Sequence, residues 1–122
     1  MDKMALFLIF SAILLAVFGQ LSMKKGMSNV GELALRELMG KKIFSLLEPF
    51  VIFGIALYIM STVLWLVVLS QEELSLVYPL VGTGYVLTAI LAKIFFKEKL
   101  TMLRIIGILL VIAGAYLIVA KM

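Results

Sequence analysis

Four apolar runs, each long enough to cross a bilayer, fill most of this 122-residue sequence. They cover residues 4–23, 50–70, 74–93 and 102–120. A transmembrane helix needs about 20 predominantly apolar residues, so each run predicts one span. Because 65% of the residues are hydrophobic and only 15% are charged, the chain leaves no room for a soluble domain. We therefore predict an all-α integral membrane protein, with residues 1–122 forming a single four-transmembrane-helix bundle.

A less apolar stretch separates the first two runs. It opens with small and polar residues that are typical of a turn: Gly26, Ser28, Asn29 and Gly31. Apolar residues then recur at helical spacing across residues 32–48, which predicts an amphipathic helix at the membrane interface. This cytoplasmic connector either takes part in substrate binding or only joins the first two spans.

The residue types that are missing exclude several kinds of chemistry. The sequence contains no cysteine and no histidine, so disulfides, thiol chemistry and imidazole metal sites are excluded. No soluble region is available to bind nucleic acid. We expect no enzymatic activity, no cofactor and no metal site.

The eleven Lys and Arg residues are unevenly distributed. Nine lie in the connector region and around the turn between the third and fourth runs: Lys24, Lys25, Arg36, Lys41, Lys42, Lys93, Lys97, Lys99 and Arg104. The opposite side has only Lys3 and Lys121. The positive-inside rule therefore predicts a multi-pass protein of the cytoplasmic (inner) membrane with both basic loops cytoplasmic and both termini outside. A single orientation favours a parallel homodimer or a heteromer with a related four-helix subunit.

The third run combines helix-weakening residues with a polar stripe. Pro79 removes a backbone donor, and Gly82 and Gly84 follow within about one turn. At helical spacing, one face carries hydroxyls, small residues and a charge: Tyr78, Gly82, Tyr85, Ala89 and Lys93. This stripe predicts either close packing against another helix or a substrate path.

Several segments together resemble one transporter group. They are AILLAVFGQLSMKKG at 12–26, GTG at 82–84, EKLT at 98–101 and RIIGILLVIAGAYLIV at 104–119. The sequence resembles the small four-helix branch of the drug/metabolite transporter superfamily, which includes the small multidrug resistance exporters. The resemblance covers nearly the whole chain and implies a transporter.

One position departs from those exporters. They carry a glutamate in the middle of the first helix, where proton and cationic substrate compete, and Ala16 occupies the matching position here. No Asp or Glu lies inside any apolar run. A methyl group cannot take up a proton, so proton-coupled export in that family's manner is disfavoured.

Three short motifs give a closer resemblance. GQL at 19–21 is followed by Lys24, LWL occupies 64–66, and Tyr78 precedes Pro79. These resemble the paired subunits that flip aminoarabinose-phosphoundecaprenol across the inner membrane. The resemblance implies a lipid flippase for a polyprenyl-phosphate-linked sugar, and basic side chains at the cytoplasmic leaflet suit an anionic head group.

The candidate substrate-binding residues form two groups. The expected phosphate-loading residues are Lys24, Lys25, Lys93 and Lys97. The residues expected to offer hydrogen bonds or a stacking surface to the sugar are Gln20, Tyr58, Ser61, Trp65, Tyr78, Thr83 and Tyr85. Replacing Lys93 with Met should spare insertion but abolish flipping. Alternatively, the lysines, above all Lys97 and Lys99, only extend toward anionic lipid.

Other functions stay open at this stage. One is a small multidrug resistance-type exporter of a small cationic metabolite, polyamine or drug, which uptake by everted vesicles would separate from lipid flipping. Another is a non-transporting subunit that stabilises a second membrane protein.

Overall fold

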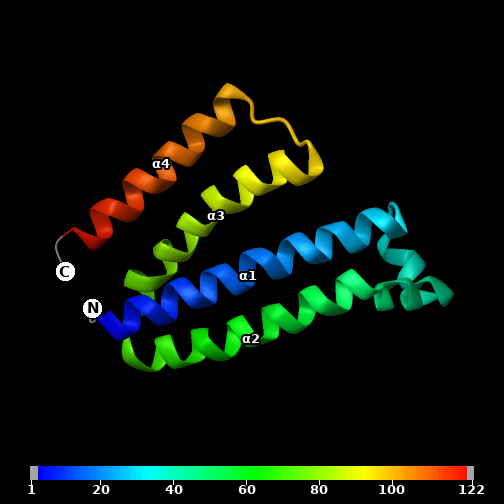
Figure 1. The fold of residues 1–122 in the computed structure, drawn as a ribbon, viewed down its shortest axis with the longest axis horizontal. Helices are drawn as coiled ribbons and strands as arrows, with labels where there is room; N and C mark the ends of the chain where they lie inside the picture. The colour runs from blue at the N-terminus through cyan, green and yellow to red at the C-terminus, as the bar shows by residue number, and fades with distance from the viewer. Residues whose placement is uncertain (1–2, 121–122) are drawn as a thin grey trace.

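A computed structural model describes residues 3–120 of the protein (Figure 1). Four of its helices are long and apolar enough to cross a membrane. They are α1 (Lys3–Val30), α2 (Pro49–Gln71), α3 (Leu74–Phe96) and α4 (Met102–Val119). The predicted all-α fold with four membrane-spanning helices is confirmed. Lys121, which the charge argument counted at the outer side, lies outside the described residues.

Helix α1 is 28 residues long and continues past residue 23, where the first span was expected to end. The turn predicted from Gly26 onward is wrong, because Gly26 is buried inside a helix that still packs on α2. A Cβ atom at Gly26 would lie 2.7 Å from the backbone nitrogen of Val51. The helix stops only before Gly31, whose φ of +93° favours glycine. Lys24 and Lys25 are therefore held on a helix.

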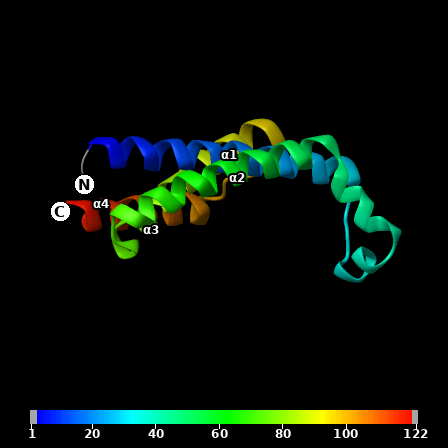
Figure 2. The same ribbon diagram turned by 90° about the horizontal axis from the view of Figure 1, so that it is seen from below.

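The connector between α1 and α2 forms two short 3₁₀ helices, η1 (Leu35–Met39) and η2 (Lys41–Leu47). The prediction of one α-helix over residues 32–48 is therefore wrong. The break lies at Gly40, whose backbone is extended with φ −114° and ψ −156°. Glycine is among the weakest helix formers, which explains the interruption there. Figure 2 shows the connector turning away from the axis of α1 and α2.

Helices α1 and α2 form an antiparallel hairpin whose backbones approach closely (Figure 1). The closest approach pairs Gly19 with Gly54: a Cβ atom at Gly19 would lie 2.8 Å from the carbonyl oxygen of Gly54 and 3.2 Å from the nitrogen of Tyr58. Only glycine on both helices leaves room for this contact. Nearer the connector, the Ser22 hydroxyl donates to the carbonyl oxygen of Phe50 at 2.6 Å.

Helix α3 packs against α1 on one side and α4 on the other. A Cβ atom at Gly84 would lie 2.7 Å from the Cγ2 atom of Ile13, so this glycine sets the distance between α3 and α1. Despite Pro79, α3 is one uninterrupted helix. The buried core joins three helices and consists of Ile9, Ile13, Val17, Val68 and Val77.

The two basic loops lie at the same end of the bundle. Figure 1 places the connector and the loop between α3 and α4 at one end, and the start of α1 and the end of α4 at the other. Positive charge from both loops therefore gathers at one end, as the positive-inside argument requires. That this end faces the cytoplasm remains a prediction.

Candidate functional site

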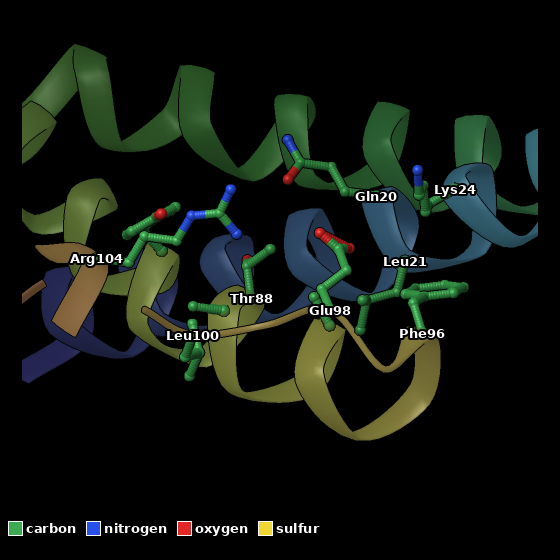
Figure 3. Close-up of a pocket in the computed structure, with 11 residues that line it drawn as sticks. Gln20, Leu21, Lys24, Thr88, Phe96, Glu98, Leu100 and Arg104 are labelled. Carbon is green, nitrogen blue, oxygen red and sulfur yellow. The ribbon is translucent and has the colours of Figure 1, made fainter. Parts of the chain in front are cut away.

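A cavity of about 320 Å³ opens between α1, α3 and the start of α4 (Figure 3). We call it the charged pocket. Its polar lining consists of Gln20 and Lys24 from α1, Tyr85 and Thr88 from α3, Glu98 from the following loop, and Arg104 from α4. Its apolar lining consists of Leu21, Ala89, Ala92, Phe96 and Leu100. The pocket thus places both signs of charge beside an apolar wall.

Helical spacing explains the α1 side of the charged pocket. Gln20 and Lys24 are four residues apart on a continuous helix and so share one face. Both residues are exposed. The Gln20 amide therefore lines an accessible cavity instead of a helix interface.

A tight turn after α3 explains the position of Glu98. Lys97 ends α3 in the left-handed conformation, with φ 56° and ψ 30°. The next backbone N–H, of Glu98, donates to the carbonyl oxygen of Ala92 at 3.4 Å. Glycine is the usual residue at such a helix end, and a lysine there costs roughly 1 kcal/mol of backbone strain. This turn directs Glu98 back to the cavity between α3 and α1.

Two hydrogen bonds fix the start of α4. The Thr101 hydroxyl caps the helix by accepting a bond from the backbone N–H of Arg104 at 3.2 Å. The Arg104 Nη1 atom donates to the carbonyl oxygen of Lys99 at 2.9 Å. Among residues 3–120 this is the one side-chain bond of Arg104, so its other guanidinium donors can bind a ligand.

The charges of this pocket are not paired with each other. Among the described residues the one ion pair joins Lys42 and Glu37 in the connector. Figure 3 shows the Glu98 carboxylate, the Arg104 guanidinium and the Gln20 amide directed toward the same space, with Lys24 at its edge. A ligand that enters the pocket would therefore meet a carboxylate and two cations that form no ion pair within residues 3–120.

A second cavity, of about 160 Å³, lies between α1, α2 and α3. We call it the aromatic pocket. Its lining consists of Tyr58, Ser61, Thr62, Trp65 and Tyr78 together with Ala12, Ile13, Ala16 and Val81. The rings of Trp65 and Tyr78 meet edge to face, with centroids 6.4 Å apart and planes at 64°. Ala16 and Gln20 are one turn apart on α1, so the two pockets lie at neighbouring depths.

The aromatic pocket has no acidic lining residue. Ala16 contributes a methyl group at the position where the resemblance to multidrug exporters implies a glutamate. The Ser61 hydroxyl is already used, because it donates to the carbonyl oxygen of Ala12 at 2.6 Å. The pocket therefore offers ring surfaces and the Tyr hydroxyls, but no carboxylate.

Lys25 lies apart from both pockets. It lines a groove of about 550 Å³ together with five phenylalanines: Phe18, Phe50, Phe53, Phe95 and Phe96. Its Nζ atom lies 5.5 Å from the centroid of the Phe50 ring, within the range of a cation–π contact. Leu21 and Phe96 line this groove and also the charged pocket, so the two spaces are neighbours.

The structure brings together most of the residues predicted from the sequence. Gln20, Lys24 and Tyr85 meet in the charged pocket, and Tyr58, Ser61, Trp65 and Tyr78 meet in the aromatic pocket. The predicted residues outside the lining of these cavities are Thr83, Lys93 and Lys97. The Thr83 hydroxyl donates to Leu80 of its own helix at 2.6 Å, and both lysines are exposed.

Sequence reasoning missed three polar residues of the charged pocket: Thr88, Glu98 and Arg104. Two of these residues lie in or near a motif that the sequence analysis had already identified. Glu98 opens the EKLT motif, and Arg104 follows it within the same basic cluster. What the pattern did not indicate is that the loop folds back onto α1.

Comparisons with known proteins identify the family of this chain. Residues 33–120 match the model of the EamA-like transporter family. The chain is 35% identical to the "probable 4-amino-4-deoxy-L-arabinose-phosphoundecaprenol flippase subunit ArnF" of Proteus mirabilis, over 95% of this chain and 91% of that protein. It is 31% identical to the protein of the same name from Yersinia enterocolitica, over 90% of this chain and 89% of that one.

A subunit with a different designation also matches. The chain is 26% identical, over 89% of its length and 91% of the relative's, to the corresponding subunit ArnE of Pseudomonas savastanoi pv. phaseolicola. No solved structure matches the chain significantly. The family match spans well over half of the sequence, and the four apolar helices agree with it. This chain is a multi-pass membrane protein that belongs to the EamA-like transporter family of the drug/metabolite transporter superfamily.

Proposed function

We propose that this chain is a subunit of a flippase that moves a polyprenyl-phosphate-linked amino sugar across the cytoplasmic membrane. The observation that carries the proposal is the charged pocket, where Lys24 and Arg104 face a cavity that also has an apolar wall. The names of the relatives supply the substrate class, since each describes a lipid with a phosphate, an amino sugar and a long apolar chain.

Loading would begin at the end of the bundle that carries the basic loops. A polyprenyl phosphate in the cytoplasmic leaflet would present its phosphate to Lys24, which lies in the part of α1 nearer the connector. Arg104 can hold phosphate with two parallel N–H donors, because a guanidinium matches the geometry of phosphate oxygens. The apolar chain remains in lipid, beside Leu21 and Phe96 at the edge of the pocket.

Movement outward would then pass the aromatic pocket. Trp65 and Tyr78 offer ring surfaces on which a sugar can stack, one helical turn of α1 beyond the charged pocket. Because Ala16 supplies only a methyl group there, this step needs no protonation of a carboxylate in the aromatic pocket. The pathway performs transport and makes or breaks no covalent bond.

The lysines outside the charged pocket have a different part in this proposal. Lys93 and Lys97 are exposed and attract the anionic head group to the membrane surface, and Lys25 holds Phe50 at the neighbouring groove. Their contribution is screened by water and salt. We therefore expect smaller effects from replacing Lys93 than from replacing Lys24.

We also propose that the working unit contains more than one chain. The relatives are named as flippase subunits of two designations, ArnF and ArnE. A parallel pair of this chain, or a pair with a related four-helix chain, would complete a pathway that one thin bundle leaves open to lipid.

The proposal is tested by following a fluorescent polyprenyl-phosphate amino sugar across vesicles that contain the protein with any chain that co-purifies. Lys24→Gln should slow flipping by about tenfold or more, since a charge-assisted bond to phosphate is lost. Lys93→Met, which the sequence alone predicted to abolish flipping, should slow it by less than about threefold, because Lys93 lies outside both pockets and its exposed charge is screened. Lys41→Gln, in the exposed connector, is the matched control.

Three outcomes would contradict the proposed loading site or the proposed function. If Lys24→Gln flips the lipid at the wild-type rate, the charged pocket is not the loading site. If Lys93→Met abolishes flipping while Lys24→Gln does not, loading occurs on the exposed face of α3. If the wild-type protein moves no polyprenyl phosphate at all, the flippase function is wrong.

One observation favours a second candidate function. Glu98 gives the charged pocket a carboxylate, which suits the export of a small cationic metabolite such as a polyamine. Uptake of a labelled polyamine by inverted vesicles, in the absence of any polyprenyl lipid, would support this alternative over lipid flipping.

A further inference from the structure

The charged pocket contains an acid that a purely phosphate-binding site does not need. Glu98 stands between Lys24 of α1 and Arg104 of α4 in the lining of one cavity. A carboxylate near a bound phosphate opposes binding by like-charge repulsion. Its presence among the cations therefore indicates a ligand that carries positive charge as well as negative charge.

The geometry keeps this acid available. Glu98 forms no ion pair with either cation, because the one ion pair in the described part of the chain lies in the connector. Its side chain also makes no hydrogen bond within the described part of the chain. Arg104 lines the same pocket but uses one donor on its own loop, because its Nη1 atom donates to the carbonyl oxygen of Lys99 at 2.9 Å. The carboxylate is thus free to accept bonds from a ligand.

The backbone fixes where the acid points. The left-handed turn at Lys97 is an uncommon conformation for a lysine, and it places Glu98 at the mouth between α3 and α1. Figure 3 shows the carboxylate directed toward the Gln20 amide across the pocket. An ammonium group there would have an acceptor in Glu98 and a second one in the Gln20 amide oxygen.

We infer that the charged pocket recognises a zwitterionic head group, with Lys24 and Arg104 binding its phosphate and Glu98 binding its ammonium group. This inference rests on the proposed function and adds the selectivity of the same site. Glu98 becomes the specificity residue that separates an amino-sugar lipid from a lipid whose sugar carries only hydroxyl groups. Selection works by attraction of the amine and by repulsion of a purely anionic head group.

The test compares two lipids that differ in one group. Vesicles containing the protein, with any chain that co-purifies, receive either a fluorescent polyprenyl-phosphate 4-amino-4-deoxyarabinose or the same lipid with a hydroxyl at that position. The wild-type protein should flip the amino lipid about tenfold faster or more. Glu98→Gln should remove that preference by slowing the amino lipid and leaving the hydroxyl lipid unchanged or faster.

Two further variants make the assignment specific. Lys24→Gln should slow both lipids by the same factor, because both carry the phosphate. Glu73→Gln is the matched acid control, since Glu73 is exposed at the start of α3 and lines none of the described cavities. Equal flipping of both lipids by the wild-type protein, or an unchanged preference in Glu98→Gln, overturns the inference and leaves the flippase function standing. Flipping of neither lipid overturns the proposed function itself.

Discussion

The Ser61 hydroxyl of α2 donates a buried hydrogen bond of 2.6 Å to the backbone carbonyl oxygen of Ala12 on α1. The bond joins two helices through residues that are 49 positions apart in the sequence. Ser61 is 6% exposed, and although it lines the aromatic pocket, its hydroxyl is bonded to the α1 backbone. The bond therefore acts first on the stability of the α1–α2 hairpin.

Ser61→Ala should lower the free energy of unfolding by about 0.5 to 1.5 kcal/mol, the range found for hydrogen bonds between membrane helices. Ser70→Ala is the matched control, because the exposed Ser70 hydroxyl donates only to Val67 of its own helix. Titration with SDS in detergent micelles, followed by circular dichroism, measures both values. Equal effects of the two replacements would show that the bond to Ala12 contributes nothing specific.

Gly54→Ala should destabilise the hairpin more strongly. A Cβ atom at Gly54 would collide with the carbonyl oxygen of Gly19 and lie 2.8 Å from the backbone nitrogen of Met23, and backbone atoms cannot move aside as a flexible side chain can. Overpacking of this kind costs about 1 to 3 kcal/mol. Gly107→Ala is the control, since nothing lies within 4 Å of a Cβ atom there. A Gly54→Ala protein as stable as Gly107→Ala would contradict the observed helix contact.

Glu48 should matter for stability although it lies outside the pockets. Its Oε2 atom accepts from the backbone N–H of Phe50 at 2.9 Å and of Val51 at 3.1 Å, and its Oε1 atom accepts from Asn29 at 3.2 Å. These bonds satisfy the free donors at the start of α2 and join it to the end of α1. Glu48→Ala should therefore lower the free energy of unfolding by about 1 kcal/mol or more.

Glu73 provides the comparison for that measurement. It occupies the same position before α3, yet its side chain makes no capping bond. Glu73→Ala should change stability by less than about 0.5 kcal/mol. Unfolding in SDS measures both variants, and a loss at Glu73 as large as the loss at Glu48 would mean that general charge effects, and not the cap, stabilise these helix starts.

The sequence was most informative where helical periodicity alone decides the outcome. Apolar runs predicted the four membrane helices. The sequence did not predict features that depend on local backbone conformation or on contacts between helices. Nothing in the residue types indicated that Gly26 packs within a helix, because the reason lies in its contact with Val51 on α2. Glu98 was missed because its position depends on a left-handed Lys97, where glycine is the expected residue.

Orientation in the membrane remains a prediction, and the absence of cysteine from the sequence allows a clean test. Gly40→Cys places a thiol in the basic connector, where a side chain has open space, and Ala120→Cys places one just after α4. A membrane-impermeant maleimide should label Ala120→Cys in cells with a permeabilised outer membrane and Gly40→Cys only in inverted vesicles. This result follows from the positive-inside rule, because nine of the eleven basic residues lie in or near the two loops at one end of the bundle. Labelling of Gly40→Cys from outside would reverse the topology and would place the charged pocket at the outer leaflet.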